Sequence, residues 1–200
     1  MNFLQITLHK MATFPAVIDA CVLFPALLRD ILLRAAEADL YRVYWSQEIL
    51  DEVTRNLVRQ NKMSPSQAQH LSSEMNKAFP EAIVEVPSLL LGAMDNDLKD
   101  RHVLAAAVVA KAQVIITANL KHFPEEALSP WEIEAQHPDT FLVNLFDLAP
   151  EKMIKVVQLS AQDRRNPVSA LDLLARLTKT VPNFTQAVST VIQASDVELS

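Results

Sequence analysis

Glycine is the residue that most limits what this sequence can form, because its 200 residues include a single one, Gly92. An average chain of this length carries about 14. A Walker phosphate loop, a G-x-G-x-x-G dinucleotide turn and the G-x-S-x-G turn of α/β-hydrolases each need two or more glycines. These three kinds of site are therefore excluded. A hairpin-rich all-β fold is disfavoured as well, because tight hairpin turns favour glycine.

The remaining composition is that of a globular protein, with 50% hydrophobic and 21% charged residues. The lone Cys21 excludes an intramolecular disulfide and any multi-cysteine metal site. Neither a secretion signal nor an apolar run of membrane-spanning length is apparent, so we expect a cytoplasmic protein without a membrane partner. We expect the first ten residues, which precede a second methionine at Met11, to be either a weakly ordered extension or the result of a misassigned start.

Short apolar runs alternate with segments of helical periodicity over the first two thirds of the chain. The predicted strands are 14–18, 41–45, 82–86 and 114–117, with 131–135 as a fifth candidate. Strands separated by helices predict an α/β fold, a Rossmann-like parallel sheet flanked by helices, over residues 12–140. Beyond it, apolar positions at helical spacing predict a small all-helical C-terminal extension over residues 141–195, with helices at 139–148, 151–161, 169–179 and 183–193.

Oxygen-bearing side chains recur at the predicted carboxyl edge of this sheet. They are Asp19 after the first strand, Glu48 in the helix after the second, Asp97 and Asp100 at the start of a long apolar helix predicted over 97–112, and Thr117 and Asn119 after the fourth strand. Any one of the acidic residues could simply cap a helix. Carboxylates that converge repel one another unless a cation or a proton intervenes, and oxygen ligands favour Mg²⁺ or Mn²⁺.

The net charge of −6 bears on the same question. A protein that binds nucleic acid is usually basic. Either the protein does not bind nucleic acid, or a metal ion neutralises some of its acidic residues where the phosphate would sit.

Four short motifs, in order, resemble those of PIN domains, and in particular of the VapC-like toxins of type II toxin–antitoxin systems. The motifs are Val17-Ile18-Asp19-Ala20-Cys21-Val22-Leu23, Trp45-Ser46-Gln47-Glu48-Ile49-Leu50, Asp100-Arg101-His102-Val103-Leu104-Ala105-Ala106-Ala107 and Ile116-Thr117-Ala118-Asn119-Leu120-Lys121. The resemblance covers about residues 13–140. The helical segment that follows resembles an extension found on a subset of these proteins.

The resemblance implies a metal-dependent ribonuclease that uses Mg²⁺ or Mn²⁺ and leaves a 5′-phosphate on its RNA product. It implies Asp19, Glu48 and Asp100 as metal-binding and catalytic carboxylates, with Asn119 at the fourth catalytic position. Many PIN domains have an aspartate there, and the uncharged amide makes Asp97 a candidate to supply the missing charge at the metal.

Three neighbouring residues, Thr117, Arg101 and Lys121, are candidates to support the carboxylates or to contact RNA. The resemblance also implies a small antitoxin protein as a partner, and a homodimer is left open.

Two other functions stay open at this point. One is a PIN-like fold whose site has decayed into a protein-binding module, for which Asn119 in place of an acid is the first sign. The other is a Mg²⁺ phosphohydrolase with Asp19 as the nucleophile. That chemistry predicts a D-x-D pair after the first strand, and Cys21 stands at the second position.

Overall fold

The fold is a five-stranded sheet in the order β3-β2-β1-β4-β5, in which every neighbouring pair is parallel. The computed structural model describes residues 13–198, so the expectation for the first ten residues lies outside the described part. The strands are β1 (Pro15–Ile18), β2 (Arg42–Ser46), β3 (Ile83–Val84), β4 (Val114–Ile116) and β5 (Glu134–Gln136). This confirms the predicted parallel α/β fold.

The order of the strands fixes where a ligand site can form. The chain starts in the centre at β1, adds β2 and β3 on one side, and then crosses back to add β4 and β5 on the other. The direction of winding therefore reverses between β1 and β4. In open parallel sheets, ligands bind outside the carboxyl ends of the strands at this switch point.

Helices connect the strands. They are α1 (Ala20–Leu23), α2 (Ala26–Glu37), α3 (Gln47–Arg59), α4 (Pro65–Ala78), α5 (Ser88–Leu91), α6 (Arg101–Ala110) and α7 (Glu125–Leu128), with short 3-10 turns η2 (Leu120–His122) and η3 (Ser129–Trp131). Ser46 caps α3 by accepting a hydrogen bond from the Ile49 N–H, and Ser64 and Gln67 form a capping box at α4. Serine is a favoured N-cap residue, and a glutamine three residues after it completes a capping box.

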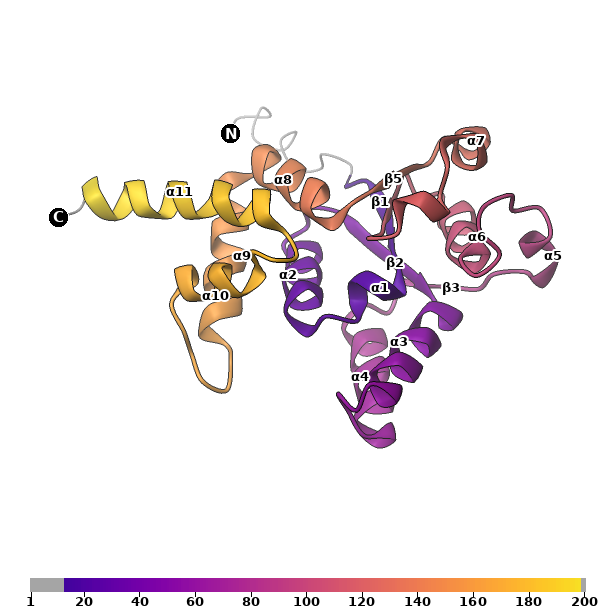
Figure 1. Cartoon of the computed structure of the whole chain (residues 1–200), viewed down its shortest axis with the longest axis horizontal. Coiled ribbons are helices and arrows are strands. Elements are labelled where there is room, and N and C mark those ends of the chain that lie inside the picture. Colours follow the sequence, from indigo (N-terminus) through magenta and orange to yellow (C-terminus); the bar gives the residue numbers. More distant parts are fainter. Residues whose placement is uncertain (1–12, 199–200) are drawn as a thin grey trace, which may run out of the picture.

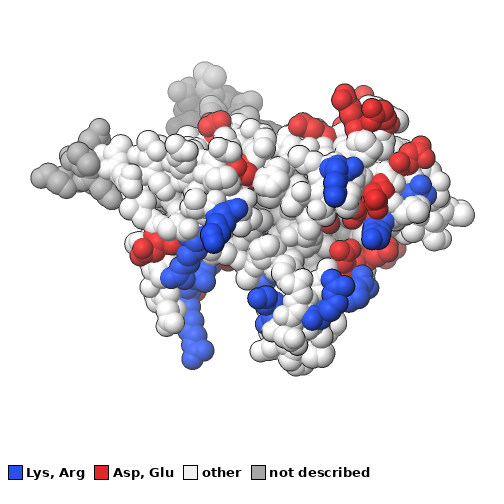
Figure 2. Space-filling model, in the orientation of Figure 1, with Lys and Arg blue, Asp and Glu red and all other residues white. Residues whose placement is uncertain are grey.

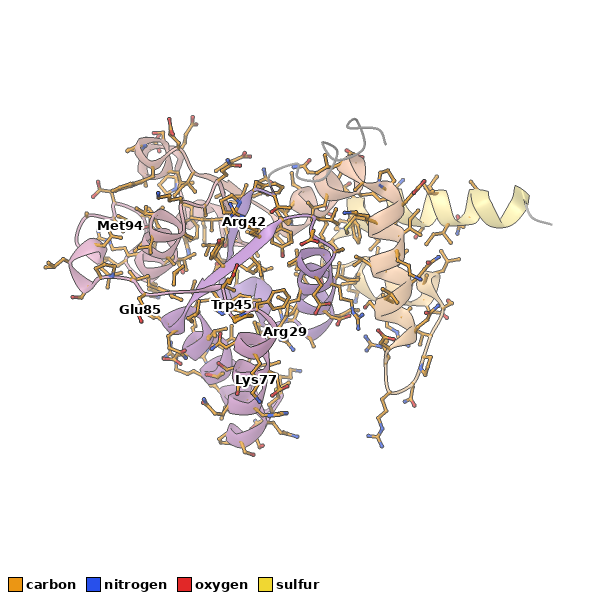
Figure 3. All side chains as sticks on the ribbon, turned by 180° about the vertical axis from the view of Figure 1, so that it is seen from behind. Arg29, Arg42, Trp45, Lys77, Glu85 and Met94 are labelled. Atoms are coloured by element: carbon orange, nitrogen blue, oxygen red, sulfur yellow. The ribbon has the colours of Figure 1, made fainter. Side chains whose placement is uncertain are left out.

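The core lies between the sheet and its helices (Figure 1). Helix α6, apolar on nearly all sides, packs across β1, β2 and β4, and α2 packs against β2. Trp45 of β2 is fully buried beside α4, where its Nε1–H donates to Asn76 Oδ1 and its ring meets Phe79 edge to face (Figure 3). The predicted helix from Asp97 is shorter than expected, because Asp97 and Asp100 lie in the loop before α6.

The C-terminal segment folds into α8 (Pro138–Leu148), α9 (Pro150–Gln162), α10 (Ala170–Leu177) and α11 (Pro182–Glu198), as the apolar periodicity predicted. These helices stand on the α2 side of the sheet, and α11 extends beyond the body (Figure 1). One hydrophobic core includes both segments, so the division of the chain at residue 140 remains a prediction.

Two kinds of contact attach this segment to the rest of the fold. Phe141 of α8 meets the Tyr41 ring edge to face at 5.0 Å, deep in the core. On α2, Arg34 pairs with Asp163 at 2.9 Å, and Asp30 accepts a hydrogen bond from Ser160 of α9. The C-terminal helices are thus packed against the sheet domain rather than tethered to it.

Within residues 13–198, left-handed backbone occurs at four turns, and none of these uses glycine. Asp39, Asn61, Lys111 and Glu132 have φ between 51° and 56°, and each ends or follows a helix. Gly92 has φ −70°, an ordinary helical value. The turns that glycine usually makes are therefore made here by polar side chains, at some cost in backbone strain.

The fifth strand lies later than predicted. Trp131 ends the turn η3 and Glu132 takes the left-handed conformation, so pairing with β4 begins only at Glu134. No helix within residues 13–198 combines the length and the apolar character that a membrane crossing requires.

Candidate active site

Asp19 lies at the switch point of the sheet. Its N–H donates to the Ile116 carbonyl at 3.0 Å, which ties the end of β1 to the end of β4. Its buried side chain does not cap α1; instead Oδ2 accepts hydrogen bonds from Thr117 Oγ1 at 2.6 Å and from Cys21 Sγ at 3.0 Å. Asp19 is therefore held by side chains and not used as a helix cap.

Cys21 is a supporting residue of this carboxylate. Burial, reinforced by the charge of Asp19, raises the pKa of its thiol to about 12. The sulfur stays protonated at neutral pH, so it is a hydrogen-bond donor and not a nucleophile.

Asp100, just before α6, is the second buried carboxylate. It makes no side-chain cap, and its Oδ2 lies 2.6 Å from His122 Nδ1. Burial raises the pKa of Asp100, the hydrogen bond from His122 opposes that shift, and the negative charge of Asp19 adds to it. Asp19 and Asp100 are thus close enough to repel.

The third carboxylate comes from Glu52 and not from Glu48. Glu48 is exposed in the first turn of α3, with no hydrogen bond or ion pair to any described residue. Glu52, one turn later, is half-buried, and burial together with the charges of Asp19 and Asp100 raises its pKa. The structure therefore brings Glu52 to Asp19 and Asp100 and leaves the predicted Glu48 exposed, and the catalytic role of either glutamate stays a prediction.

The direction of helical side chains explains this difference. The Cα–Cβ bonds of a helix tilt toward its N-terminus, so a side chain covers the turn before its own. Glu52 in the second turn consequently reaches back toward the sheet edge, whereas Glu48 in the first turn is exposed. A search one helical turn further along α3 would have found Glu52 in the sequence.

His102 is a buried neighbour of Glu52. It comes from the first turns of α6, is 6% exposed, and its Nε2 lies 3.5 Å from Glu52 Oε2. That nitrogen has no hydrogen-bond partner among the described residues. The positive charge that His102 carries when protonated lowers the pKa of Glu52, against the effect of burial.

A second group of ligands borders Asp100. One ligand atom each from Asp97, Asp100 and His122 lies within 4.8 Å of the others, and the Asp97 N–H donates to the His122 carbonyl at 3.2 Å. Asp97 is exposed, and its Oδ1 accepts from the Lys99 N–H, a local turn contact. Asp97, a predicted metal ligand, thus has His122 as a neighbouring potential ligand.

The other predicted residues lie around these carboxylates. Thr117 is buried and holds both Asp19 and, by accepting at Oγ1, the N–H of Asn119. Arg101 donates to the Asn96 carbonyl at 3.4 Å rather than pairing with Asp97, and Lys121 is exposed without a partner among residues 13–198. The side chain of Asn119 makes no hydrogen bond within that part of the chain.

The charge distribution matches this arrangement. On the face drawn in Figure 2, Asp and Glu gather mainly on the side that carries α6 and α7. Lys and Arg lie along the lower edge, at the α9 and α10 end and over α3 and α4, and a few stand among the acidic residues. The atoms that could bind a metal in the acidic region are carboxylate oxygens. The Asn119 amide and the His122 imidazole lie at its border. Hard oxygen donors of this kind fit Mg²⁺ or Mn²⁺, and a cation would relieve the repulsion that raises the pKa of Glu52 and Asp100.

Comparison with known proteins adds two family matches and a relative. Residues 15–121 match the PIN domain, and residues 138–190 match the VapC50 C-terminal domain. Over 97 residues the chain is 50% identical to the Mycobacterium tuberculosis protein named "Putative ribonuclease VapC50". The aligned stretch is 48% of this chain and 57% of that relative's length. The PIN match extends over more than half of the chain and contains Asp19, Glu52, Asp100 and Asn119. The chain therefore belongs to the PIN domain family.

Proposed function

We propose that the protein is a metal-dependent endoribonuclease in which Asp19, Glu52 and Asp100 hold Mg²⁺ or Mn²⁺. The observation that carries the proposal is the gathering of these carboxylates at the switch point of the sheet, where burial, together with the charges of Asp19 and Asp100, raises the pKa of Glu52. The PIN match and the name of the relative support the same activity.

Each residue has a separate task in the proposed reaction. A bound Mg²⁺ or Mn²⁺ supplies a water of lowered pKa and offsets the charge that develops on the phosphate. Thr117 and Cys21 fix the orientation of the Asp19 carboxylate by donating to Oδ2. His122 does the same for Asp100. Asn119 contributes an uncharged oxygen, and Asp97 adds a negative charge beside Asp100.

The proposal is preferred over the two alternatives for physical reasons. A phosphohydrolase with an aspartyl nucleophile needs a second aspartate two residues after the first, and Cys21 stands at that position. A decayed site has no reason to keep carboxylates in mutual repulsion, since burial raises the pKa of Glu52 and of Asp100 and that costs stability.

Metal binding should raise the thermal stability of the protein. At a hundredfold excess over the dissociation constant, binding stabilises the native state by about 2.7 kcal/mol. For a chain of this size that corresponds to a rise of roughly 5–10 °C in melting temperature. We expect this rise when Mn²⁺ replaces EDTA in a calorimetric melt, and we expect it to be absent in Asp100→Asn.

Equal melting temperatures of the wild type in EDTA and in millimolar Mn²⁺ would count against any metal site and favour the decayed module. Glu48→Gln is a matched control, because Glu48 is exposed and outside the carboxylate group. Its melting temperature should still rise with Mn²⁺.

We further propose that the protein is the toxin of a toxin–antitoxin pair and that its partner covers the acidic site. Exposed leucines occur next to residues of the proposed site: Leu98 follows Asp97 and is 77% exposed, and Leu89 on α5 is 92% exposed. Leu120, next to Asn119, is exposed too. A partner segment with apolar residues and an arginine would cover the leucines and pair with the carboxylates.

Expression of the wild type alone should therefore arrest bacterial growth. Asp19→Ala and Asp100→Ala should relieve the arrest, while Lys155→Ala, an exposed position on α9, should remain toxic. Growth curves with soluble protein verified by immunoblot provide the measurement. Normal growth with the wild type would remove the case for a toxin, and equal toxicity of Asp100→Ala would place the activity away from the carboxylates.

A further inference from the structure

His102 is a buried side chain that the proposed mechanism does not use. It comes from α6, two residues after Asp100, and is 6% exposed. Its Nε2 has no hydrogen-bond partner among the described residues. A buried polar atom left unpaired costs about 1–3 kcal/mol, so an atom in this position needs a reason.

The possible partner of that nitrogen is a carboxylate oxygen of the site. Nε2 lies 3.5 Å from Glu52 Oε2, which is ion-pair range but longer than a hydrogen bond. No other ion-pair partner of His102 occurs within residues 13–198. Hydrogen bonds in active sites are often long before the ligand binds and shorten in the complex.

We propose that His102 is the positioning residue of Glu52. Its Nε2–H donates to Oε2 once the site is loaded, which leaves the second carboxylate oxygen of Glu52 for the cation. The inference rests on the proposed metal site. His102 thereby joins α6, which follows Asp100, to α3, which carries Glu52, and sets the separation between these two carboxylates.

The arrangement parallels that of Asp100. His122 Nδ1 is already 2.6 Å from Asp100 Oδ2, so each of these two carboxylates has an imidazole beside one of its oxygens. Outer partners of this kind orient the groups that bind a metal, and removing one typically weakens metal affinity by about 10–100-fold. We expect a loss in this range for His102.

The test compares side chains that differ in reach. The Gln side-chain amide extends about as far as Nε2 of histidine, whereas the Asn amide is shorter and Leu carries no donor. Mn²⁺ dissociation constants are measured on the whole chain by electron paramagnetic resonance of free Mn²⁺. We expect His102→Leu and His102→Asn to weaken Mn²⁺ binding by about 10–100-fold, and His102→Gln to recover most of the wild-type affinity.

A double-mutant cycle with Glu52→Gln identifies the partner. If His102 acts through Glu52, adding His102→Leu to Glu52→Gln should weaken Mn²⁺ binding no further. His70→Leu on α4, an exposed position, is the control and should match the wild type. Thermal melting in EDTA shows whether each variant folds. If His102→Leu does not fold, the comparison of His102→Gln with His102→Asn tests the role of His102.

The inference is overturned if His102→Leu folds and binds Mn²⁺ as the wild type does. It is also overturned if Gln and Asn are equally defective, or if the loss persists unchanged in the Glu52→Gln background. A wild type that binds no Mn²⁺ overturns the metal site and this inference together. A wild type that binds Mn²⁺ but cleaves no RNA contradicts the ribonuclease alone, and the affinities still decide the role of His102.

Discussion

Glu52→Gln is expected to lower RNA cleavage by about 100-fold or more, because a cation at such a site contributes several kcal/mol of transition-state stabilisation. Removing one of its three carboxylates weakens both its binding and its position. The measurement is the rate at which end-labelled RNA is cleaved in Mn²⁺, over a range of metal concentrations. The side chain keeps its size, so the half-buried contacts of Glu52 on α3 are disturbed little.

Glu48→Gln is the matched control on the same helix, one turn earlier. Glu48 is exposed and has no partner among the described residues, so cleavage should stay within a factor of about two, the scale of a surface substitution. The opposite ranking, with Glu48→Gln inactive and Glu52→Gln active, would return the catalytic role to Glu48 and contradict the geometry of α3.

Phe141→Ala should have the largest effect on stability among the C-terminal residues. Phe141 is 1% exposed, and its ring contacts Tyr41 at 5.0 Å and Phe14 at 6.0 Å. Removal of a buried phenylalanine ring typically costs about 3–5 kcal/mol. In a chain of this size, that cost lowers the melting temperature by roughly 6–20 °C.

Leu148→Ala, at the other end of α8, is the control for Phe141→Ala. It truncates an exposed side chain of the same helix, so it tests whether the loss of stability comes from burial. Leu148 is 55% exposed, and its truncation should change stability by no more than about 0.5 kcal/mol.

A chain ending at residue 140 should be less soluble, because it exposes the apolar surfaces of α2 and Tyr41. If such a chain stays monodisperse and equally stable, the C-terminal helices form an independent module.

The fold could be read from the sequence because its signals are local and repeated. Buried parallel strands appear as unbroken apolar runs, and prolines separate helices of strong apolar period. The four-residue helices α5 and α7 escaped prediction, since one turn is too short to show a period. The late start of β5 depends on the turn at Glu132, which propensity does not reveal.

The candidate site was predictable only in part, for a geometric reason. Asp19, Thr117 and Asn119 follow strands, and the carboxyl ends of parallel strands meet by construction. Glu52 and His102 lie on helices, where the side chain's direction decides what it reaches. The proximity of Asp97 to His122 depends on a contact between two loops, the hydrogen bond from the Asp97 N–H to the His122 carbonyl, which no sequence pattern records.

The four left-handed turns also change the balance of backbone entropy in this protein. A glycine in place of another residue enlarges the unfolded ensemble and weakens the fold by about 0.4–1 kcal/mol where its flexibility is not needed. With one glycine in 200 residues, nearly the whole chain avoids that loss. The strain at Asp39, Asn61, Lys111 and Glu132, of order 1 kcal/mol each, is confined to four positions at the ends of helices. The unfolded chain is consequently stiffer than that of an average protein of this length, and folding requires the loss of less backbone freedom.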